Sequence, residues 1–221
     1  MNLLIATTNP GKVLEIQHEL DLAGLHDSFR ILSLKDFPPF PDCVEDRPTF
    51  IGNATKKARH FAHLAQALTL ADDSGLCIDA LSGRPGVLSA RYAGANGGGG
   101  SGGGDRHAID AANNAKVLAE LEPIPDDQRQ AQFVCALALA TPSGGGGDLA
   151  VMVDEVPGVM LRAPRGANGF GYDPLFFFPQ FNKTTAELDM ATKSQISHRG
   201  KALRRMLAWL KENHSRLPAL K

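Results

Sequence analysis

The sequence has few cysteines, almost no net charge and no long apolar segment. Its three cysteines, Cys43, Cys77 and Cys135, are odd in number and lack CxxC spacing, which excludes a disulfide scaffold and is typical of reduced thiols in a cytosolic protein. We interpret all three as structural or incidental. The N-terminus has no basic segment of the secretory type, and the longest near-apolar run, Phe133 to Ala140, is too short to span a bilayer. The sequence therefore predicts a cytoplasmic protein that does not cross a membrane.

The charge balance excludes a general nucleic-acid binder. The net charge is -1 at pH 7, whereas a phosphate backbone favours a basic surface. Hydrophobic residues make up 43% and charged residues 21%, which is typical of a globular protein. With 221 residues, no internal repeat and no long linker, we expect a single domain over residues 1–221.

Glycine is concentrated in two tracts, Gly97 to Gly104 and Gly144 to Gly147, which hold nearly half of the 23 glycines. Such tracts have no side chains to pack and high chain entropy. We expect flexible loops inserted into the fold, with no role in holding phosphate.

Apolar segments with strand character alternate with amphipathic segments of helical period. We expect strands at 2–7, 30–33, 68–71, 76–80, 132–140 and 149–155, and helices at 11–24, 49–68, 107–121 and from 197 onward. Interleaved helices and strands predict an α/β fold with a mixed sheet.

An acidic pair, Asp72 and Asp73, follows the apolar run that ends at Ala71 and precedes Ser74-Gly75. We predict a tight turn here between two strands. Adjacent carboxylates repel one another, and a divalent cation held through oxygen ligands most readily offsets that repulsion. Mg²⁺ is the first candidate.

A second constellation joins the first strand to the first helix. Backbone amides and a helix N-terminus there point toward one anion-binding position, and a lysine adds positive charge. It is not a Walker A loop, because Ala6 stands where a glycine is needed and Val13 where Ser or Thr is needed. The alternative is an ordinary turn with a solvent-exposed lysine. The segment comprises Thr7, Thr8, Asn9, Pro10, Gly11 and Lys12.

Two further constellations lie in the C-terminal part. Glycines around Phe170 let the backbone bend and present an aromatic face, which suits stacking on a base, although a buried core ring is the simpler interpretation. Lys193 and Ser197-His198-Arg199 gather donors near a helix start. Basic residues there oppose the helix dipole, so a bound anion or carbonyl would explain their placement.

His60 and His63 lack a third ligand at matching spacing, so we do not favour a metal site at these two histidines.

These segments, in this order, resemble the inosine triphosphate pyrophosphatase family, the non-canonical purine nucleoside triphosphate pyrophosphatases. The motifs that carry the resemblance are ATTNPGK, Glu45 with TFIGNATKKA, ADDSGL with SARY, GFGYDP and SHRGKAL. The resemblance implies an elongated mixed sheet flanked by helices, two lobes around a central nucleotide cleft, and a homodimer. It also implies hydrolysis of inosine, deoxyinosine and xanthosine triphosphates to the monophosphate and pyrophosphate.

The resemblance also implies residue roles. Glu45 and Asp73 would bind Mg²⁺, and Asp73 would accept a proton from the attacking water. The segment from Thr7 to Lys12 would hold the triphosphate together with Lys57 and Ser74. The sugar and base would be surrounded by Phe170, Gly171, Tyr172, Asp173, Lys193, His198 and Arg199.

Two alternatives remain open at this stage. One is a nucleoside triphosphate pyrophosphatase with a different modified-base preference, because the motifs constrain the phosphate end better than the base end. The other is a nucleotide-binding module without catalysis, which would require that the set of acidic residues be degraded.

Arg199 or a backbone amide could distinguish a 6-carbonyl from a 6-amino group of the purine, because a donor left unpaired against the amino group of adenine carries an energetic penalty.

Overall fold

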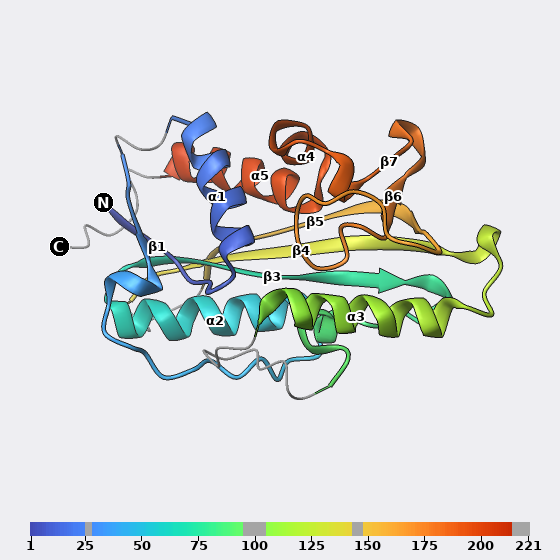
Figure 1. Ribbon diagram of the computed structural model, residues 1–221. Coiled ribbons are helices and arrows are strands. Elements are labelled where there is room, and N and C mark those ends of the chain that lie inside the picture. Colours follow the sequence, from blue (N-terminus) through green and yellow to red (C-terminus); the bar gives the residue numbers. More distant parts are fainter. Residues whose placement is uncertain (25–27, 95–104, 143–147, 214–221) are drawn as a thin grey trace. The chain divides into compact units, whose positions relative to one another are not determined.

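The computed structural model describes residues 1–24, 28–94, 105–142 and 148–213. Both predicted glycine-rich loops, 97–104 and 144–147, lie outside the described residues. The strands form one mixed sheet in the order β2-β1-β3-β4-β5-β6-β7 (Figure 1). Strand β1 pairs in parallel with β2 and β3, whereas β6 pairs antiparallel with β5 and β7. The predicted α/β class with a mixed sheet is confirmed.

The elements follow the expected alternation. The strands are β1 (Asn2–Ile5), β2 (Arg30–Ser33), β3 (Leu68–Ile78), β4 (Gln130–Ala140), β5 (Asp148–Met160), β6 (Phe176–Phe178) and β7 (Lys183–Thr184). The helices are α1 (Pro10–Leu22), α2 (Phe50–Ala65), α3 (Arg106–Leu121), α4 (Met190–Ile196) and α5 (His198–Asn213). The four predicted helices correspond to α1, α2, α3 and α5 within one or two turns at their ends.

The chain divides into two compact units, each built from separate stretches of sequence. The first unit comprises Met1–Asp73, Cys135–Asp154 and Arg199–Lys221, and the second comprises Ser74–Val134 and Glu155–His198. The expected single domain over residues 1–221 stays a prediction. We describe each unit separately.

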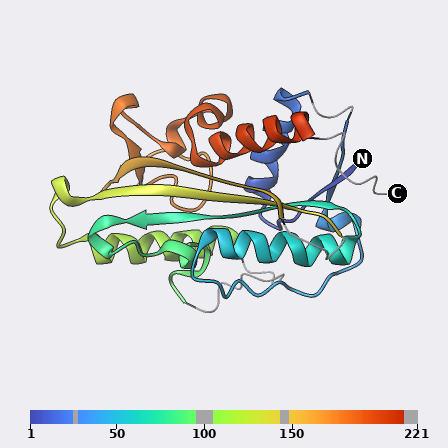
Figure 2. The ribbon, with the colours of Figure 1, turned by 180° about the vertical axis from the view of Figure 1, so that it is seen from behind.

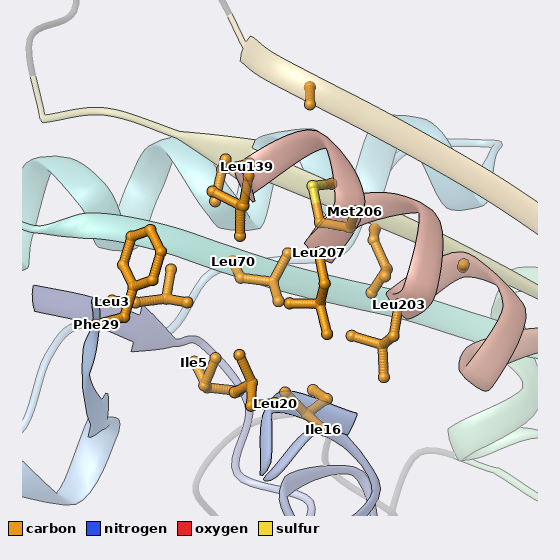
Figure 3. Close-up of a cluster of buried hydrophobic side chains, with 14 of the residues drawn as sticks. Leu3, Ile5, Ile16, Leu20, Phe29, Leu70, Leu139, Leu203, Met206 and Leu207 are labelled. Carbon is orange, nitrogen blue, oxygen red and sulfur yellow. The ribbon is translucent and has the colours of Figure 1, made fainter. Parts of the chain in front are cut away.

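In the first unit, the sheet buries both faces. Successive strand residues point to opposite sides, so Leu3 and Ile5 belong to one core cluster and Leu4 to another. Helices α1 and α5 cover the first face and α2 covers the opposite one (Figures 1 and 2). Figure 3 shows the first cluster, in which Leu203, Met206 and Leu207 of α5 meet side chains of α1, β1, β3 and β4. The amphipathic character expected of the helix from 197 onward is confirmed.

The core of the second unit joins α3 to strand residues through Val117 and Leu121. Asp105 caps α3, because its carboxylate accepts a hydrogen bond from the His107 amide at 3.0 Å. At the other end of α3, the buried guanidinium of Arg129 donates to the carbonyls of Leu121, Ile124, Met160 and Leu161. The last carbonyl of α3, that of Leu121, thereby has a side-chain donor.

The predicted turn at the acidic pair is wrong. Strand β3 runs without interruption from Leu68 to Ile78, so Asp72 and Asp73 lie within it. The repulsion between the two carboxylates needs no turn, because neighbouring strand residues point to opposite faces of the sheet.

None of the helices in the described part of the chain is both long enough and apolar enough to span a membrane.

Candidate active site

Asp72, in the first unit, is the centre of a buried charge network. Its carboxylate accepts hydrogen bonds from Nζ of Lys12, from Nε of Arg199 at 3.0 Å and from the Cys135 thiol at 3.2 Å. Burial alone would raise the pKa of Asp72, but Arg199 and Lys12 together hold the pKa well below its usual range. Asp72 therefore stays ionised, and its charge is compensated by protein groups.

Arg199 is buried within the same network. Besides its contact with Asp72, its guanidinium donates through Nη1 to the Glu15 carboxylate of α1. Two buried carboxylates thus explain why a basic residue lies at the start of α5, where the sequence suggested a bound anion or carbonyl. The predicted contact of Arg199 with a base stays a prediction.

Asp73 has a different environment from its neighbour. It is only 6% exposed, and its Oδ2 has no hydrogen-bond partner among the described residues. Burial raises the pKa of Asp73 to about 6, although Lys57 and Lys12 oppose this effect. A buried carboxylate with an unused oxygen and a pKa near neutrality is well suited to accept a proton or to ligate a cation.

Lys57 of α2 links the groups around Asp73. Its Nζ forms an ion pair with Glu45 and donates to the backbone carbonyl of Asp72 at 3.0 Å. Burial by itself would lower the pKa of Lys57, but Glu45 and Asp73 outweigh it and raise the pKa. Lys57 therefore remains a cation, and the predicted residues Glu45, Lys57 and Asp73 are brought together.

The carboxylates fit a magnesium ion of the kind that keeps part of its water shell. Within the described residues, no group of three or more His, Cys, Asp or Glu side chains could hold a metal ion by itself. Mg²⁺ is commonly held by one or two carboxylates, with water and substrate phosphates completing its octahedron. Glu45 and Asp73, whose Oδ2 accepts no hydrogen bond from the described residues, offer the hard oxygen donors that such a site requires.

In the segment from Thr7 to Lys12, side chains of the segment itself accept hydrogen bonds from several of its backbone amides. Asn9 caps α1 and accepts from the amides of Gly11 at 2.9 Å and Lys12 at 3.4 Å, while Thr7 Oγ1 accepts from the Asn9 amide at 3.2 Å. Lys12 is not the solvent-exposed lysine of the alternative interpretation, because its side chain is 14% exposed and paired with Asp72. Thr8 and Pro10 are exposed.

The second unit holds the predicted aromatic turn. Gly169 and Gly171 flank Phe170 with φ angles of 79° and 61°, in the left-handed region that favours glycine. The Asp173 carboxylate accepts from the Phe170 amide at 2.9 Å, and the Tyr172 hydroxyl donates to the Ser89 carbonyl at 2.8 Å. Phe170 is partly exposed rather than a buried core ring.

Lys193 lies against the same turn. Its Nζ is 2.6 Å from Asp173 Oδ2 and 4.9 Å from the centroid of the Phe170 ring, which is a cation–π distance. His198, also in the second unit, is buried and stacks on Phe133 with ring centroids 4.9 Å apart. The structure therefore brings Phe170, Asp173 and Lys193 together. Ser74 directly follows the acidic pair and is the first residue of the second unit.

Comparison with known proteins decides the family. The model of the Ham1 family matches residues 3–209 of the chain. The chain belongs to the Ham1 family. It is 49% identical to the dITP/XTP pyrophosphatase of Geobacter sulfurreducens, over 91% of this chain and 92% of that protein. It is 45% identical to the dITP/XTP pyrophosphatase of Desulforamulus reducens, over 94% of each chain.

Solved structures of Ham1 proteins have the same fold. A HAM1 protein from Coxiella burnetii aligns with a TM-score of 0.80 and 38% identity, covering 96% of this chain and 99% of that one. A nucleoside-triphosphatase / dITP/XTP pyrophosphatase from Mycobacterium abscessus aligns with a TM-score of 0.71 and 41% identity, covering 95% and 100%.

Sequence reasoning missed several residues of this Ham1 chain. Glu15 follows Lys12 by three positions on α1, so the shared helix face was a readable signal. Cys135, interpreted as structural or incidental, contacts Asp72, but this contact depends on strand pairing that no local pattern shows. Asp110 and Asn114 of α3 both contact Gly171, at 2.8 Å each. Their spacing of four was visible, whereas their partner was not.

Proposed function

We propose that this chain hydrolyses nucleoside triphosphates that carry altered purines, namely dITP, XTP and ITP, to the monophosphate and pyrophosphate. Support comes from curated relatives at 45–49% identity that are named dITP/XTP pyrophosphatase. The observation that carries the proposal is Asp73, which is buried beside Lys57 and whose Oδ2 has no hydrogen-bond partner in the part of the chain that the structure describes. By this reaction the enzyme would remove altered purines from the nucleotide pool.

The first unit supplies the groups that a triphosphate requires. The phosphates repel an incoming water, so cationic groups must lower that barrier before a base can act. Lys12 and Lys57 supply fixed positive charge, with Thr7 to Gly11 and Ser74 as further phosphate contacts. Glu45 and Asp73 would hold Mg²⁺, which when bound would neutralise phosphate charge. Asp73 accepts the proton of the attacking water.

The turn of the second unit supplies contacts to the base. Phe170 offers a partly exposed ring for stacking, and Gly171, Tyr172, Asp173, Lys193 and His198 surround the sugar and base. Two nitrogens of Arg199 already donate to Asp72 and Glu15. We therefore assign recognition of the 6-carbonyl to a backbone amide, the alternative to Arg199. An unpaired amide opposite a 6-amino group would disfavour ATP.

We further propose a cytoplasmic homodimer. The dimer rests on the resemblance to the pyrophosphatase family. The location is supported by Cys43, Cys77 and Cys135, all of which are free thiols.

A panel of nucleoside triphosphates tests the reaction. With Mg²⁺ present, we expect pyrophosphate to be released from ITP, dITP and XTP far faster than from ATP or GTP, and we expect excess EDTA to stop the reaction. Orthophosphate as the sole primary product would contradict the reaction type. Preference for a modified pyrimidine nucleotide would contradict the base assignment, and binding without any product would leave a non-catalytic module.

Replacement of Asp73 tests the mechanism. We expect Asp73→Asn to lower kcat for ITP by roughly 100-fold or more, because removing a general base typically costs that much. The matched control is Asp127→Asn, which changes an exposed carboxylate on a surface turn. Circular dichroism should show both variants folded. Full activity of Asp73→Asn would refute the role of Asp73.

A further inference from the structure

Helix α3 holds both hydrogen-bonding groups of one glycine in the aromatic turn. The Gly171 amide donates to Oδ2 of Asp110 at 2.8 Å, and Nδ2 of Asn114 donates to the Gly171 carbonyl at 2.8 Å. Asp110 and Asn114 are four residues apart and therefore lie on the same face of the helix. The other carboxylate oxygen of Asp110 is 3.4 Å from Arg106, one turn earlier. A single helix face thus fixes the peptide groups on both sides of Gly171.

Helix α3 contacts Gly171 itself through these two hydrogen bonds. A methyl group added at Gly171 would meet no heavy atom within 4 Å, so no side chain presses on the turn at this point. The backbone of Gly171 is left-handed, with φ of 61°, and glycine reaches many other conformations as readily, so the two hydrogen bonds help to select this one. Asp110 and Asn114 are both partly exposed, so loss of either hydrogen bond would loosen the backbone at Gly171 without opening a cavity in the core.

The position of Gly171 sets the position of Phe170. The turn is fixed on one side by Asp173, which binds the Phe170 amide and Lys193, and on the other side by α3. The adjacent Asn113 fixes a second segment, because it accepts from the Ala93 amide at 2.8 Å. The same turn of helix thus supports two loops that carry motif residues.

We infer that Asp110 and Asn114 are positioning residues for purine recognition: they hold Gly171 so that Phe170 and the neighbouring amides present one fixed surface to the base. The inference rests on the proposed function, in which residues 170–173 contact the base. It goes beyond that function, because neither residue carries a motif signal and neither takes part in phosphate chemistry.

Three variants test the inference. We expect Asp110→Ala and Asn114→Ala each to raise KM for ITP by roughly tenfold, the effect of losing one hydrogen bond to a charged or amide group. We expect kcat to stay within about twofold. Asp110→Asn keeps an acceptor oxygen for the Gly171 amide and should retain a KM close to wild type. His107→Ala, at an exposed position of the same helix, is the matched control.

Binding measurements separate the two ends of the substrate. By calorimetry, Asp110→Ala and Asn114→Ala should each weaken the binding of inosine monophosphate by a similar factor and leave the binding of pyrophosphate unchanged. The preference of the enzyme for ITP over ATP should then be lost. Equal losses for every substrate and for pyrophosphate, or failure of all three variants to fold, would assign these residues a structural role and overturn the inference. Unchanged KM in folded variants would also overturn it while the proposed function stands. If the wild type neither binds nor hydrolyses any purine nucleotide, the proposed function fails first, and the inference with it.

Discussion

Asp72 and Asp73 are adjacent residues whose surroundings give them opposite properties. Asp72 is surrounded by three donors and is held ionised, with its pKa well below the usual range. Asp73 keeps one oxygen without a partner among the described residues. Alternation along β3 separates the two side chains, so one serves the internal charge network and the other is available for chemistry.

The two aspartates should differ in their contribution to stability. We expect Asp72→Asn to lower the free energy of unfolding by about 3–5 kcal/mol, because it leaves the partly buried Lys12 and the buried Arg199 without their shared counter-charge. Asp73→Asn should change it by less than about 1 kcal/mol, because its Oδ2 has no hydrogen-bond partner among the described residues and Lys57 keeps its ion pair with Glu45. Urea unfolding of both variants without metal provides the comparison. Equal losses in the two variants would contradict this division.

At the residue scale, the sequence predicted identities better than partners. Motif resemblance singled out Glu45, Lys57 and Asp73, and the fold brings these three side chains together, while their roles stay predictions. The pairing of Arg199 with Asp72 joins positions that are 127 residues apart. No local pattern encodes such a contact.

At the scale of elements, the turn around Phe170 depends on two glycines for different reasons. A Cβ at Gly169 would lie 2.0 Å from Asp173 Oδ2, whose carboxylate is already fixed by the Phe170 amide and Lys193. A Cβ at Gly171 would meet open space. The first glycine therefore permits a close approach, and the second permits only a left-handed backbone.

This difference predicts unequal effects of the same substitution. We expect Gly169→Ala to lower kcat/KM for ITP by at least about tenfold, because it displaces Asp173 and with it Lys193. Gly171→Ala should carry only the left-handed penalty of about 1–2 kcal/mol in stability and a smaller loss of activity. Steady-state kinetics and thermal unfolding of the two variants decide the matter. Comparable loss of kcat/KM in both would show that backbone conformation, not the Asp173 contact, is the requirement.

Element prediction succeeded where hydrophobic period was strong and failed where charge interrupted it. The amphipathic pattern located α2, α3 and α5, since their apolar stripes are regular. Strand β3 was divided in two because Asp72, Asp73 and Gly75 look like a turn in isolation. Tertiary partners for the carboxylates overrode that local preference.

At the scale of the whole molecule, the interleaving of elements was sufficient to predict an α/β fold with a mixed sheet. Strand order was not predictable in the same way, because adjacency in a sheet depends on contacts between distant segments. The division into two discontinuous units was likewise unreadable, since β3, β4 and β5 each contribute residues to both.

The proposed dimer is a property of the whole molecule that one measurement decides. We expect light scattering coupled to size-exclusion chromatography to give twice the chain mass of 23.6 kDa at micromolar concentration. The reason is the resemblance to a family whose members are usually dimeric. A mass of one chain across the accessible concentration range would contradict the proposal.

The donors around Asp72 also constrain the order in which the protein can fold. They come from Lys12, Cys135 and Arg199, at separations of 60, 63 and 127 residues from the carboxylate. Contacts of such long range form late, because the loop-closure entropy must be overcome first. During synthesis, the buried carboxylate cannot acquire its full set of partners until the ribosome has added Arg199. The charge network that holds Asp72 ionised is therefore completed late in folding and not by local structure along β3.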